Sequence, residues 1–308
     1  MEIALQFVLL ALGFVMLAKG ADWFVEGAAG IAMRFGIPQL VIGLTIVAMG
    51  TSAPEAAVSI AAAVKGNADI TIGNIVGSNI LNILVILGLA ASIVPIAVAR
   101  STVRIEIPFM IGVTALLFYQ GRDGSISLAD GGVLMVAFAA YMMYLYTMAM
   151  KSNVDSDLEE PGLPLGRCLL GAVGGLALII AGSNVTVGAA TSIATYAGLS
   201  ERFIGLTIVA LGTSLPELFT SVAAARRGNA DIAIGNIVGS NIFNILFVVG
   251  LSSLIIDIPF ASAFNFDTYV ALGAAVLLLL CVLRTQQLQR WAGALMLVCY
   301  AAYLGYIL

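Results

Sequence analysis

The chain has 308 residues, of which 61% are hydrophobic and only 10% are charged. A globular domain carries about 25% charged residues, so 13 basic and 17 acidic side chains are too few for a soluble surface of this size. The composition predicts a polytopic membrane protein embedded in a lipid bilayer. It excludes a soluble enzyme, a nucleic-acid-binding protein and a disulfide-rich secreted domain, and no feature indicates a protein partner.

Histidine is absent, and Cys168, Cys281 and Cys299 lie singly in apolar segments. Imidazole chemistry is therefore excluded, and the cysteines lack the spacing of metal ligands. We expect buried, unreactive thiols. The first apolar run has no basic region before it and no cleavage site, so it predicts a membrane span rather than a signal peptide.

Ten apolar segments approach the length of about 20 residues that a membrane helix needs. The first and sixth are expected to extend past Gly20 and Gly182, because the apolar periodicity continues there. A polar stretch with four acids and two prolines, 151–166, is predicted to be a cytoplasmic linker. The ten spans are predicted at 3–19, 37–63, 71–94, 105–120, 128–149, 167–190, 203–225, 233–256, 268–283 and 290–307.

The lysines and arginines predict the orientation, since they concentrate in cytoplasmic loops. With ten spans, ten basic residues fall on one side of the membrane and three on the other. Both termini are therefore predicted to be extracytoplasmic, in a multi-pass protein of the cell (inner) membrane.

An internal repeat is the strongest signal in the sequence. Residues 43–89 align without a gap with residues 205–251, at an offset of 162, and 34 of the 47 pairs are identical. Most of the identical residues are polar, glycine or proline. Chance similarity between two apolar helices would not produce these identities, so the repeat indicates a duplication.

The duplication predicts two five-helix repeats, 1–150 and 167–308. An odd number of spans per copy makes the second copy enter the membrane from the opposite side. Inverted repeats of this kind place a transport site at mid-membrane between the two copies. The predicted fold is thus an all-α polytopic membrane protein with ten helices in two inverted repeats.

Each repeat carries a GTSxPE motif within an apolar span, at 50–55 and 212–217. Pro54 has no N–H for the carbonyl of Gly50, and Pro216 has none for the carbonyl of Gly212. The helices are predicted to break there, which is tolerated at membrane depth only where freed carbonyls face protein, water or an ion. A plain proline kink satisfied by hydroxyl groups is the structural alternative.

Glu55 and Glu217 make a functional interpretation stronger. A carboxylate at bilayer depth costs about 2.5–3.5 kcal/mol on insertion scales, and no span holds a lysine or arginine between its first and last residues to pair with it. Thr51 lies four residues before Glu55, and Thr213 lies four before Glu217, so each pair shares a helix face. A protonated structural glutamate is the alternative, but its recurrence at matched positions favours a pair that binds a cation.

A second element in each repeat supplies further oxygens. Polar residues recur every four positions along it, at Asn74, Ser78, Asn82 and again at Asn236, Ser240, Asn244. The serines and the last asparagines are candidate ligands, whereas Asn74 and Asn236 are expected to bond between helices. The GxxxG glycines, Gly73 and Gly77 with Gly235 and Gly239, are expected to allow close helix packing.

Every candidate ligand is a hard oxygen, which suits Ca²⁺, Mg²⁺ or alkali ions rather than zinc or copper. Two carboxylates with flexible neighbours favour Ca²⁺, since Mg²⁺ sheds its water reluctantly. The same two charges could instead hold Na⁺ ions or protons. Such mutual exclusion is a physical basis for exchange.

These paired motifs resemble the two repeats of the cation/Ca²⁺ antiporter superfamily, in its prokaryotic sodium/calcium exchanger branch, and the resemblance extends to the ten-span plan. It implies an antiporter, not an enzyme, which exchanges Ca²⁺ for Na⁺ by alternating access and needs no cofactor. The first and sixth helices would slide against the other helices. The resemblance implies Ca²⁺ ligands at Glu55, Glu217, Thr51 and Thr213. It implies Na⁺ ligands at Ala48, Thr51, Ser52, Glu55, Ser78, Asn82, Ala210, Thr213, Ser214, Glu217, Ser240 and Asn244, with Ala48 and Ala210 acting through their carbonyls.

Some alternatives stay open. Proton-coupled relatives usually have a GNxxE sequence in place of GTSxPE, so the threonines favour Na⁺, but a Ca²⁺/H⁺ antiporter on the same scaffold remains the second hypothesis. Asn82 and Asn244 stand where potassium-dependent relatives use an acid, which argues against K⁺ co-transport. An intramembrane hydrolase is disfavoured because two pseudo-symmetric glutamates give no reason for separate acid and base roles. A purely structural subunit would leave the twin buried carboxylates unexplained.

Overall fold

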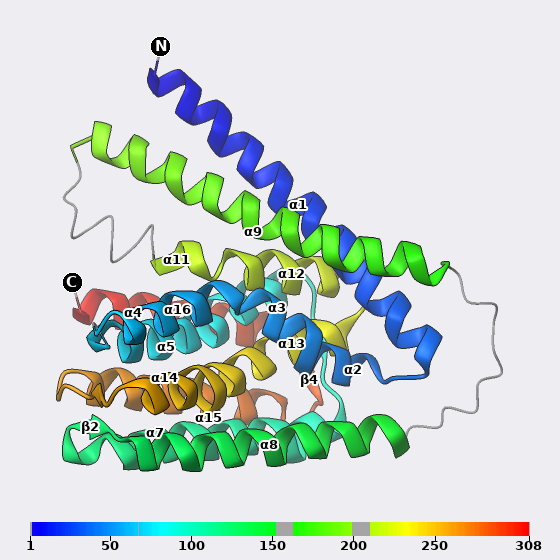
Figure 1. The fold of residues 1–308 in the computed structure, drawn as a ribbon. Helices are drawn as coiled ribbons and strands as arrows, with labels where there is room; N and C mark the ends of the chain where they lie inside the picture. Colours follow the sequence, from blue (N-terminus) through cyan, green and yellow to red (C-terminus); the bar gives the residue numbers. More distant parts are fainter. Residues whose placement is uncertain (1, 67, 152–162, 199–209, 308) are drawn as a thin grey trace.

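The computed structural model describes residues 2–66, 68–151, 163–198 and 210–307. Within these residues the chain is almost wholly helical, and its long apolar helices lie side by side (Figure 1). Eight of them are long and apolar enough to cross a membrane, and the bent pair Gln39–Thr51 and Ala53–Val64 raises the number to nine. The prediction of an all-helical polytopic membrane protein is confirmed to this extent.

The first predicted span is one long helix, α1, which passes Asp22 and Glu26 without a break, as the continuing periodicity indicated. The elements that follow alternate between α-helix and short π-helix, the latter labelled η1 to η3. In chain order the elements are α1 (Glu2–Phe35), α2 (Gln39–Ile42), η1 (Gly43–Val47), α3 (Ala48–Thr51), α4 (Ala53–Val64), α5 (Asp69–Leu81), η2 (Asn82–Leu87), α6 (Gly88–Ile93), β1 (Ile96–Ala97), η3 (Thr102–Glu106), α7 (Ile107–Gln120), the 3₁₀ turn η4 (Gly121–Asp123), β2 (Ser125–Ile126) and α8 (Leu128–Lys151).

The described part of the second half follows the same general order, without counterparts of η3 and η4. Most of the predicted linker and the beginning of the predicted span 203–225 lie outside the described residues, so the seventh span is seen only from Ala210 onward. The elements are α9 (Leu165–Tyr196), α11 (Ala210–Thr213), α12 (Leu215–Arg226), α13 (Ala230–Phe243), the π-helix η6 (Asn244–Val249), α14 (Gly250–Ile255), β3 (Ile258–Pro259), α15 (Phe264–Val282), β4 (Gln287–Leu288) and α16 (Arg290–Ile307).

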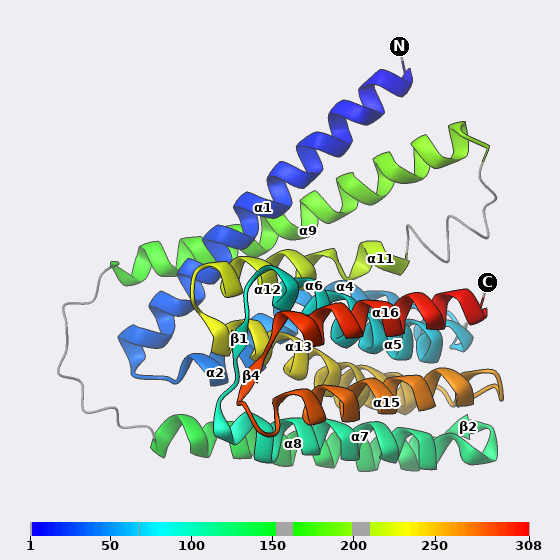
Figure 2. The same cartoon turned by 180° about the vertical axis from the view of Figure 1, so that it is seen from behind.

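Helices α1 and α9 form a pair that crosses one face of the remaining helices, as both views show (Figures 1 and 2). Small residues let their backbones meet. A Cβ atom on Gly20 would lie 2.9 Å from the carbonyl oxygen of Gly175, and one on Gly27 would lie 2.4 Å from the amide nitrogen of Ala172. The two helices therefore pack closely along one another, with α12 as a principal neighbour in the rest of the protein.

The two spans that carry the second polar element lie at the centre of the fold. In the spans Ile70–Ile93 and Ala230–Ile255, 78% and 94% of the most apolar windows are buried, against 17% in α1, α8 and α16. The outer helices therefore expose apolar side chains such as Val136 and Leu170 where lipid would lie. The polar residues of the inner spans are shielded from it.

Two short antiparallel sheets of two strands each join the halves. They are the β-structure in the part of the chain that the structure describes. Strand β1 lies beside β4 (Figure 2), where Ile96 pairs with Leu288, and Ser125 of β2 pairs with Pro259 of β3. Each ladder follows the end of a helix, where backbone groups need new partners. The three cysteines are unpaired. Cys168 and Cys281 are buried as expected, whereas Cys299 is only partly buried, so the expectation is wrong for Cys299.

Candidate cation-binding site

Both predicted helix breaks are present. Ser52 separates α3 from α4 with φ −81° and ψ 7°, and the two parts of this span differ in direction by 51°. Ser214 separates α11 from α12 with φ −90° and ψ 5°. Pro54 and Pro216 lie in the first turn of the new helices, where a missing N–H costs nothing.

Pro216 leaves the carbonyl of Gly212 without a donor in its own helix, and a side chain from α9 supplies the hydrogen bond instead. The hydroxyl of Ser183 on α9 donates a 2.7 Å hydrogen bond to the carbonyl oxygen of Gly212. The matched position on α1 is Ala21, which has no hydroxyl. Sequence reasoning missed Ser183, although a serine inside the apolar α9 was a visible signal.

The breaks place Glu55 and Glu217 in the first turns of α4 and α12, with 1% of each residue exposed. Each carboxylate accepts a hydrogen bond from the serine at the other break. Ser52 Oγ donates to Glu217 Oε1 over 2.8 Å, and Ser214 Oγ donates to Glu55 Oε1 over 3.3 Å. This crossed pairing brings the two glutamates together, near enough for their charges to repel.

One oxygen of each carboxylate remains without a hydrogen-bond partner. Glu55 Oε2 and Glu217 Oε2 are buried and unpaired, and so are Asn82 Oδ1 and Asn244 Oδ1. Helix α12, which carries Glu217, packs against η2, which begins at Asn82. Helix α4 likewise packs against η6, which begins at Asn244. The four unpaired oxygens are thus two matched pairs on adjoining segments.

The amide nitrogens of the same asparagines are held by residues that the sequence reasoning missed. Asn82 Nδ2 donates to Asn241 Oδ1 over 2.9 Å, and Asn244 Nδ2 donates to Asn79 Oδ1 over 3.1 Å. Asn79 and Asn241 also donate to each other's carbonyl oxygens over 3.1 Å. With the nitrogens used in this way, the amide oxygens of Asn82 and Asn244 are left as acceptors. The signal was present, since Asn79 and Asn241 are identical in both repeats.

Asn74 and Asn236 bond between helices, as predicted. Asn74 Nδ2 donates to Ser59 Oγ over 2.9 Å and to the carbonyl of Glu55 over 3.3 Å. Asn236 Nδ2 makes the matched bonds to Ser221 Oγ and to the carbonyl of Glu217, over 2.9 and 3.4 Å. These bonds fix the backbone that carries each glutamate.

The remaining predicted ligands lie around this centre. Thr51 Oγ1 donates to Asn236 Oδ1 over 2.9 Å, and Ser240 Oγ donates to the carbonyl of Ala48 over 3.3 Å. The side chain of Thr213 interacts with Glu55, and Ser78 is buried at the position that matches Ser240. Ala210 begins α11, and its side chain lies outside the described residues.

The GxxxG prediction holds fully in one copy. A Cβ atom on Gly235 would lie 3.1 Å from the Gly43 backbone, and one on Gly239 would lie 2.8 Å from that of Leu44, so α13 and η1 touch through both glycines. In the first copy, Gly73 faces the ring of Phe264, and no atom of the described residues lies within 4 Å of a Cβ on Gly77. The segment that matches Leu44 in the other copy lies outside the described residues, so close packing at Gly77 stays a prediction.

The donor set is chemically uniform, since carboxylate, hydroxyl, amide and carbonyl oxygens are all hard ligands. No group of three or more histidine, cysteine, aspartate or glutamate side chains occurs in the described part of the chain. Two buried carboxylates with unpaired oxygens fit a small cation without its water, and not a soft transition metal.

Comparison with known proteins identifies the family of the chain. The family described as sodium/calcium exchanger protein matches residues 5–147 and 168–308. The chain belongs to this family, in the prokaryotic exchanger branch of the cation/Ca²⁺ antiporter superfamily. Its members are membrane transporters and not enzymes.

Individual relatives match along almost the whole chain. The sodium/calcium exchanger MaX1 of Methanosarcina acetivorans is 33% identical over 98% of this chain and 98% of its own. The inner membrane protein YrbG of Escherichia coli strain K12 is 39% identical over 94% of this chain and 92% of its own. A solved structure of the sodium-calcium exchanger NCX_Mj superimposes with a TM-score of 0.86 and 34% identity, and covers 98% of this chain and 99% of its own.

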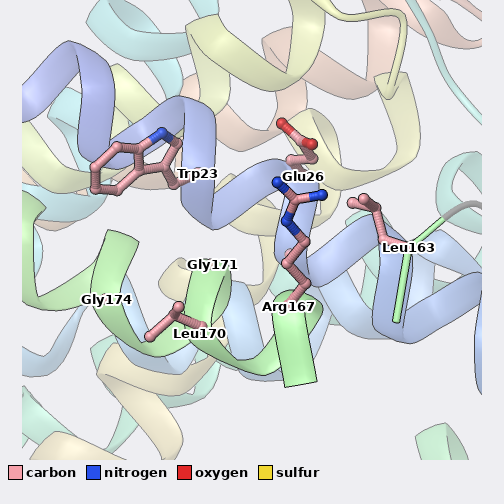
Figure 3. Close-up of a pocket in the computed structure, with 8 residues that line it drawn as sticks. Trp23, Glu26, Leu163, Arg167, Leu170, Gly171 and Gly174 are labelled. Atoms are coloured by element: carbon pink, nitrogen blue, oxygen red, sulfur yellow. The ribbon is translucent and has the colours of Figure 1, made fainter. Parts of the chain in front are cut away.

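A surface pocket of this family member lies apart from the buried centre. It has a volume of about 490 Å³ and lies between α1 and α9, where Trp23 and Glu26 face Leu170 and Arg167 (Figure 3). None of the predicted ligands lines it. The exchanger's buried carboxylates, and not this groove, are therefore the candidate site.

Proposed function

We propose that the protein is a secondary active antiporter that exchanges Ca²⁺ for Na⁺ across the membrane by alternating access. The observation that carries the proposal is the crossed pairing of Glu55 and Glu217, with one unpaired oxygen left on each. Two carboxylates balance the charge of one Ca²⁺, and the same oxygens can serve Na⁺ ions instead. Occupation by one ion then excludes the other.

We assign Glu55, Glu217, Thr51 and Thr213 to Ca²⁺. Na⁺ would use these residues together with neutral oxygens around them. Ala48 and Ser240 support this assignment, because the Ala48 carbonyl already faces the Ser240 hydroxyl at 3.3 Å. The full proposed Na⁺ set is Ala48, Thr51, Ser52, Glu55, Ser78, Asn82, Ala210, Thr213, Ser214, Glu217, Ser240 and Asn244.

The proposed architecture has ten helices in two inverted repeats, 1–150 and 167–308, joined by a cytoplasmic linker at 151–166. Hydrogen bonds that recur at an offset of 162 residues support it, such as the reciprocal bonds of Asn79 and Asn241. Both termini lie toward the same end of the helices (Figure 1), as an even number of crossings requires. The basic residues favour the extracytoplasmic side for that end.

The α1–α9 pair is the proposed moving part. Its helices are held to each other through close glycine contacts, and the face they present to α12 is a separate surface. Sliding of this pair would open the buried centre to one side of the membrane and then to the other. The E. coli relative is named as an inner membrane protein, which supports the same location here.

Flux measurement with the purified protein in sealed vesicles tests the proposal. Gradients of Na⁺, K⁺ and H⁺ are imposed one at a time, and the uptake of radioactive Ca²⁺ is followed. We expect Ca²⁺ uptake when an outward Na⁺ gradient is the only gradient imposed, because Na⁺ leaving the vesicle would drive Ca²⁺ in. Uptake driven by a pH gradient in the absence of Na⁺ would select the Ca²⁺/H⁺ alternative, and uptake under no gradient would refute exchange.

A further inference from the structure

Two ion pairs tie α1 to the end of α12. Arg227, which directly follows α12, donates from Nε to Asp22 Oδ1 over 3.1 Å and from Nη1 to Glu26 Oε2 over 3.2 Å. Asp22 and Glu26 are four residues apart on α1, so they lie on one face of that helix. One guanidinium group thus holds two carboxylates of a helix that belongs to the proposed moving pair.

Open space on both sides of Arg227 makes this contact reversible. A surface cavity of about 370 Å³ is lined by Arg227 and Glu26, and another of about 350 Å³ is lined by Arg227 and Asp22. The three side chains are between 36% and 49% exposed. Water can therefore replace the ion pairs when α1 moves, because exposed pairs are weak enough to break.

The internal repeat shows which contact would form at the opposite end of the molecule. The offset of 162 matches Arg227 with Lys65, which directly follows α4, and it matches α1 with α9, as Gly20 and Gly182 illustrate. The contact of α1 with α12 therefore corresponds to a contact of α9 with α4.

These two corresponding contacts differ in the present conformation. Helix α1 packs against α12, whereas no comparable contact joins α9 to α4 within the described residues. Both views show the α1–α9 pair diverging from the remaining helices toward the end where the chain begins (Figures 1 and 2). The pair is thus held at the Arg227 end and not at the Lys65 end.

The corresponding contact would lack its acids. The positions of α9 that match Asp22 and Glu26 hold Asn184 and Gly188. Lys65 would therefore meet no carboxylate there. A Cβ atom on Gly188 would meet no atom within 4 Å among the described residues, so the space at this position allows a side chain.

A ring contact has the same asymmetry. Phe14 of α1 lies against Phe219 of α12, with the ring centroids 6.1 Å apart. The matched residues in the other copy are Leu176 and Ala57, which have no rings. Charge pairing and aromatic packing therefore both favour α1 on α12 over α9 on α4.

We propose that Arg227, Asp22 and Glu26 form a one-sided latch that sets the resting conformation of the exchanger. The latch holds the α1–α9 pair at the Arg227 end, which the basic residues predict to be cytoplasmic, and no equivalent forms at the Lys65 end. This inference rests on the proposed sliding of the pair. Two exposed ion pairs shift a two-state equilibrium by about 2- to 30-fold, which decides the predominant state without preventing exchange.

Hydrogen–deuterium exchange of the purified full chain tests the proposal in the absence of Na⁺ and Ca²⁺. Arg227→Gln removes both ion pairs. We expect amide exchange to rise about twofold or more around Arg227 and to fall around Lys65, because a population shift opens one end and closes the other. Lys65→Gln is the matched control and should leave both ends unchanged.

A variant with added acids makes the test reciprocal. Asn184→Asp/Gly188→Glu supplies the two carboxylates for Lys65, at positions that are exposed. It should change the exchange at the two ends in the opposite directions to Arg227→Gln. If Arg227→Gln does not fold, Asp22→Asn/Glu26→Gln removes the same ion pairs and carries the same expectation.

Three results would overturn the latch. They are faster exchange at both ends in Arg227→Gln, which a merely structural contact would produce, unchanged exchange at both ends, and no opposite shift in Asn184→Asp/Gly188→Glu. The measurement needs no ion flux. Opposite shifts at the two ends without Na⁺-driven Ca²⁺ uptake would therefore refute the proposed exchange and support the latch, and the reverse combination would do the converse.

Discussion

The hydroxyl of Ser52 donates a 2.8 Å hydrogen bond to the carboxylate of Glu217, which comes from the other copy of the repeat. The matched bond from Ser214 to Glu55 is longer, at 3.3 Å. Each half of the duplicated sequence therefore completes the site of the other half. A single copy would contain a carboxylate without its serine, so the functional unit is the pair.

The first prediction concerns the charges themselves. Glu55→Gln and Glu217→Gln keep the shape of the side chain but remove one negative charge from the proposed Ca²⁺ site. We expect each to reduce Na⁺-driven Ca²⁺ uptake by about 100-fold or more. Ca²⁺ would lose one of its two balancing carboxylates, and leaving a buried charge without its opposite partner costs about 3–5 kcal/mol. Elution of the variants as monodisperse protein shows that they fold, and normal uptake by both would refute the assignment.

The second prediction uses the unequal serine bonds. Ser52→Ala removes the shorter hydrogen bond and Ser214→Ala the longer one. A hydrogen bond to a charged group contributes about 1.5–3 kcal/mol, so Ser52→Ala should weaken Ca²⁺ binding roughly 10- to 100-fold, and Ser214→Ala by less. Titration of Ca²⁺ binding to both variants measures the difference. Equal affinities, or a larger loss in Ser214→Ala, would contradict the geometry.

The third prediction concerns the α1–α9 pair, for which neighbouring glycines offer a matched control. A Cβ atom on Gly175 would lie 2.5 Å from the amide nitrogen of Phe24, whereas one on Gly174 would meet no atom within 4 Å. Gly175→Ala should separate the helices and lower the thermal stability of the detergent-solubilised protein by several degrees. Gly174→Ala should leave it unchanged or raise it slightly, since alanine favours helix. A similar melting temperature for the two variants would show that the contact carries no strain.

The fourth prediction concerns the serine that caps the broken helix. Ser183→Ala leaves the buried carbonyl of Gly212 without its donor, which costs about 1–3 kcal/mol. Ser192 on the same helix is exposed and bonds only within its own helix, so Ser192→Ala is the control. We expect a lower unfolding temperature for Ser183→Ala alone. A loss of stability in the control of the same size would remove the special role of Ser183.

Several features of the buried polar centre could be predicted from the sequence, although the ligand roles of its residues stay predictions. The glutamates, the breaks and the interhelical role of Asn74 and Asn236 follow from polar residues repeated within apolar spans, because such residues are costly in lipid unless they are used. The crossed pairing of Ser52 with Glu217 could not be predicted, since it depends on how the two copies face each other. Asn79 and Asn241 were missed for the same reason, because their partners lie 162 residues away.

The length of α1 and α9 was only partly predictable. Charged or polar residues such as Asp22 and Asn184 suggest an end to a span, yet the helices continue through them. Asp22 and Glu26 are tolerated because Arg227 at the end of α12 donates to both, over 3.1 and 3.2 Å. That contact joins segments about 200 residues apart in sequence, which local periodicity cannot reveal.

The most direct measurement of the central claim is a crystal structure with Sr²⁺, a heavier substitute for Ca²⁺, located by its anomalous scattering. The account predicts one central peak that contacts the carboxylates of both Glu55 and Glu217 and disappears when Na⁺ is added in excess. A peak bound to one glutamate only, or no peak between them at saturating Sr²⁺, would contradict it.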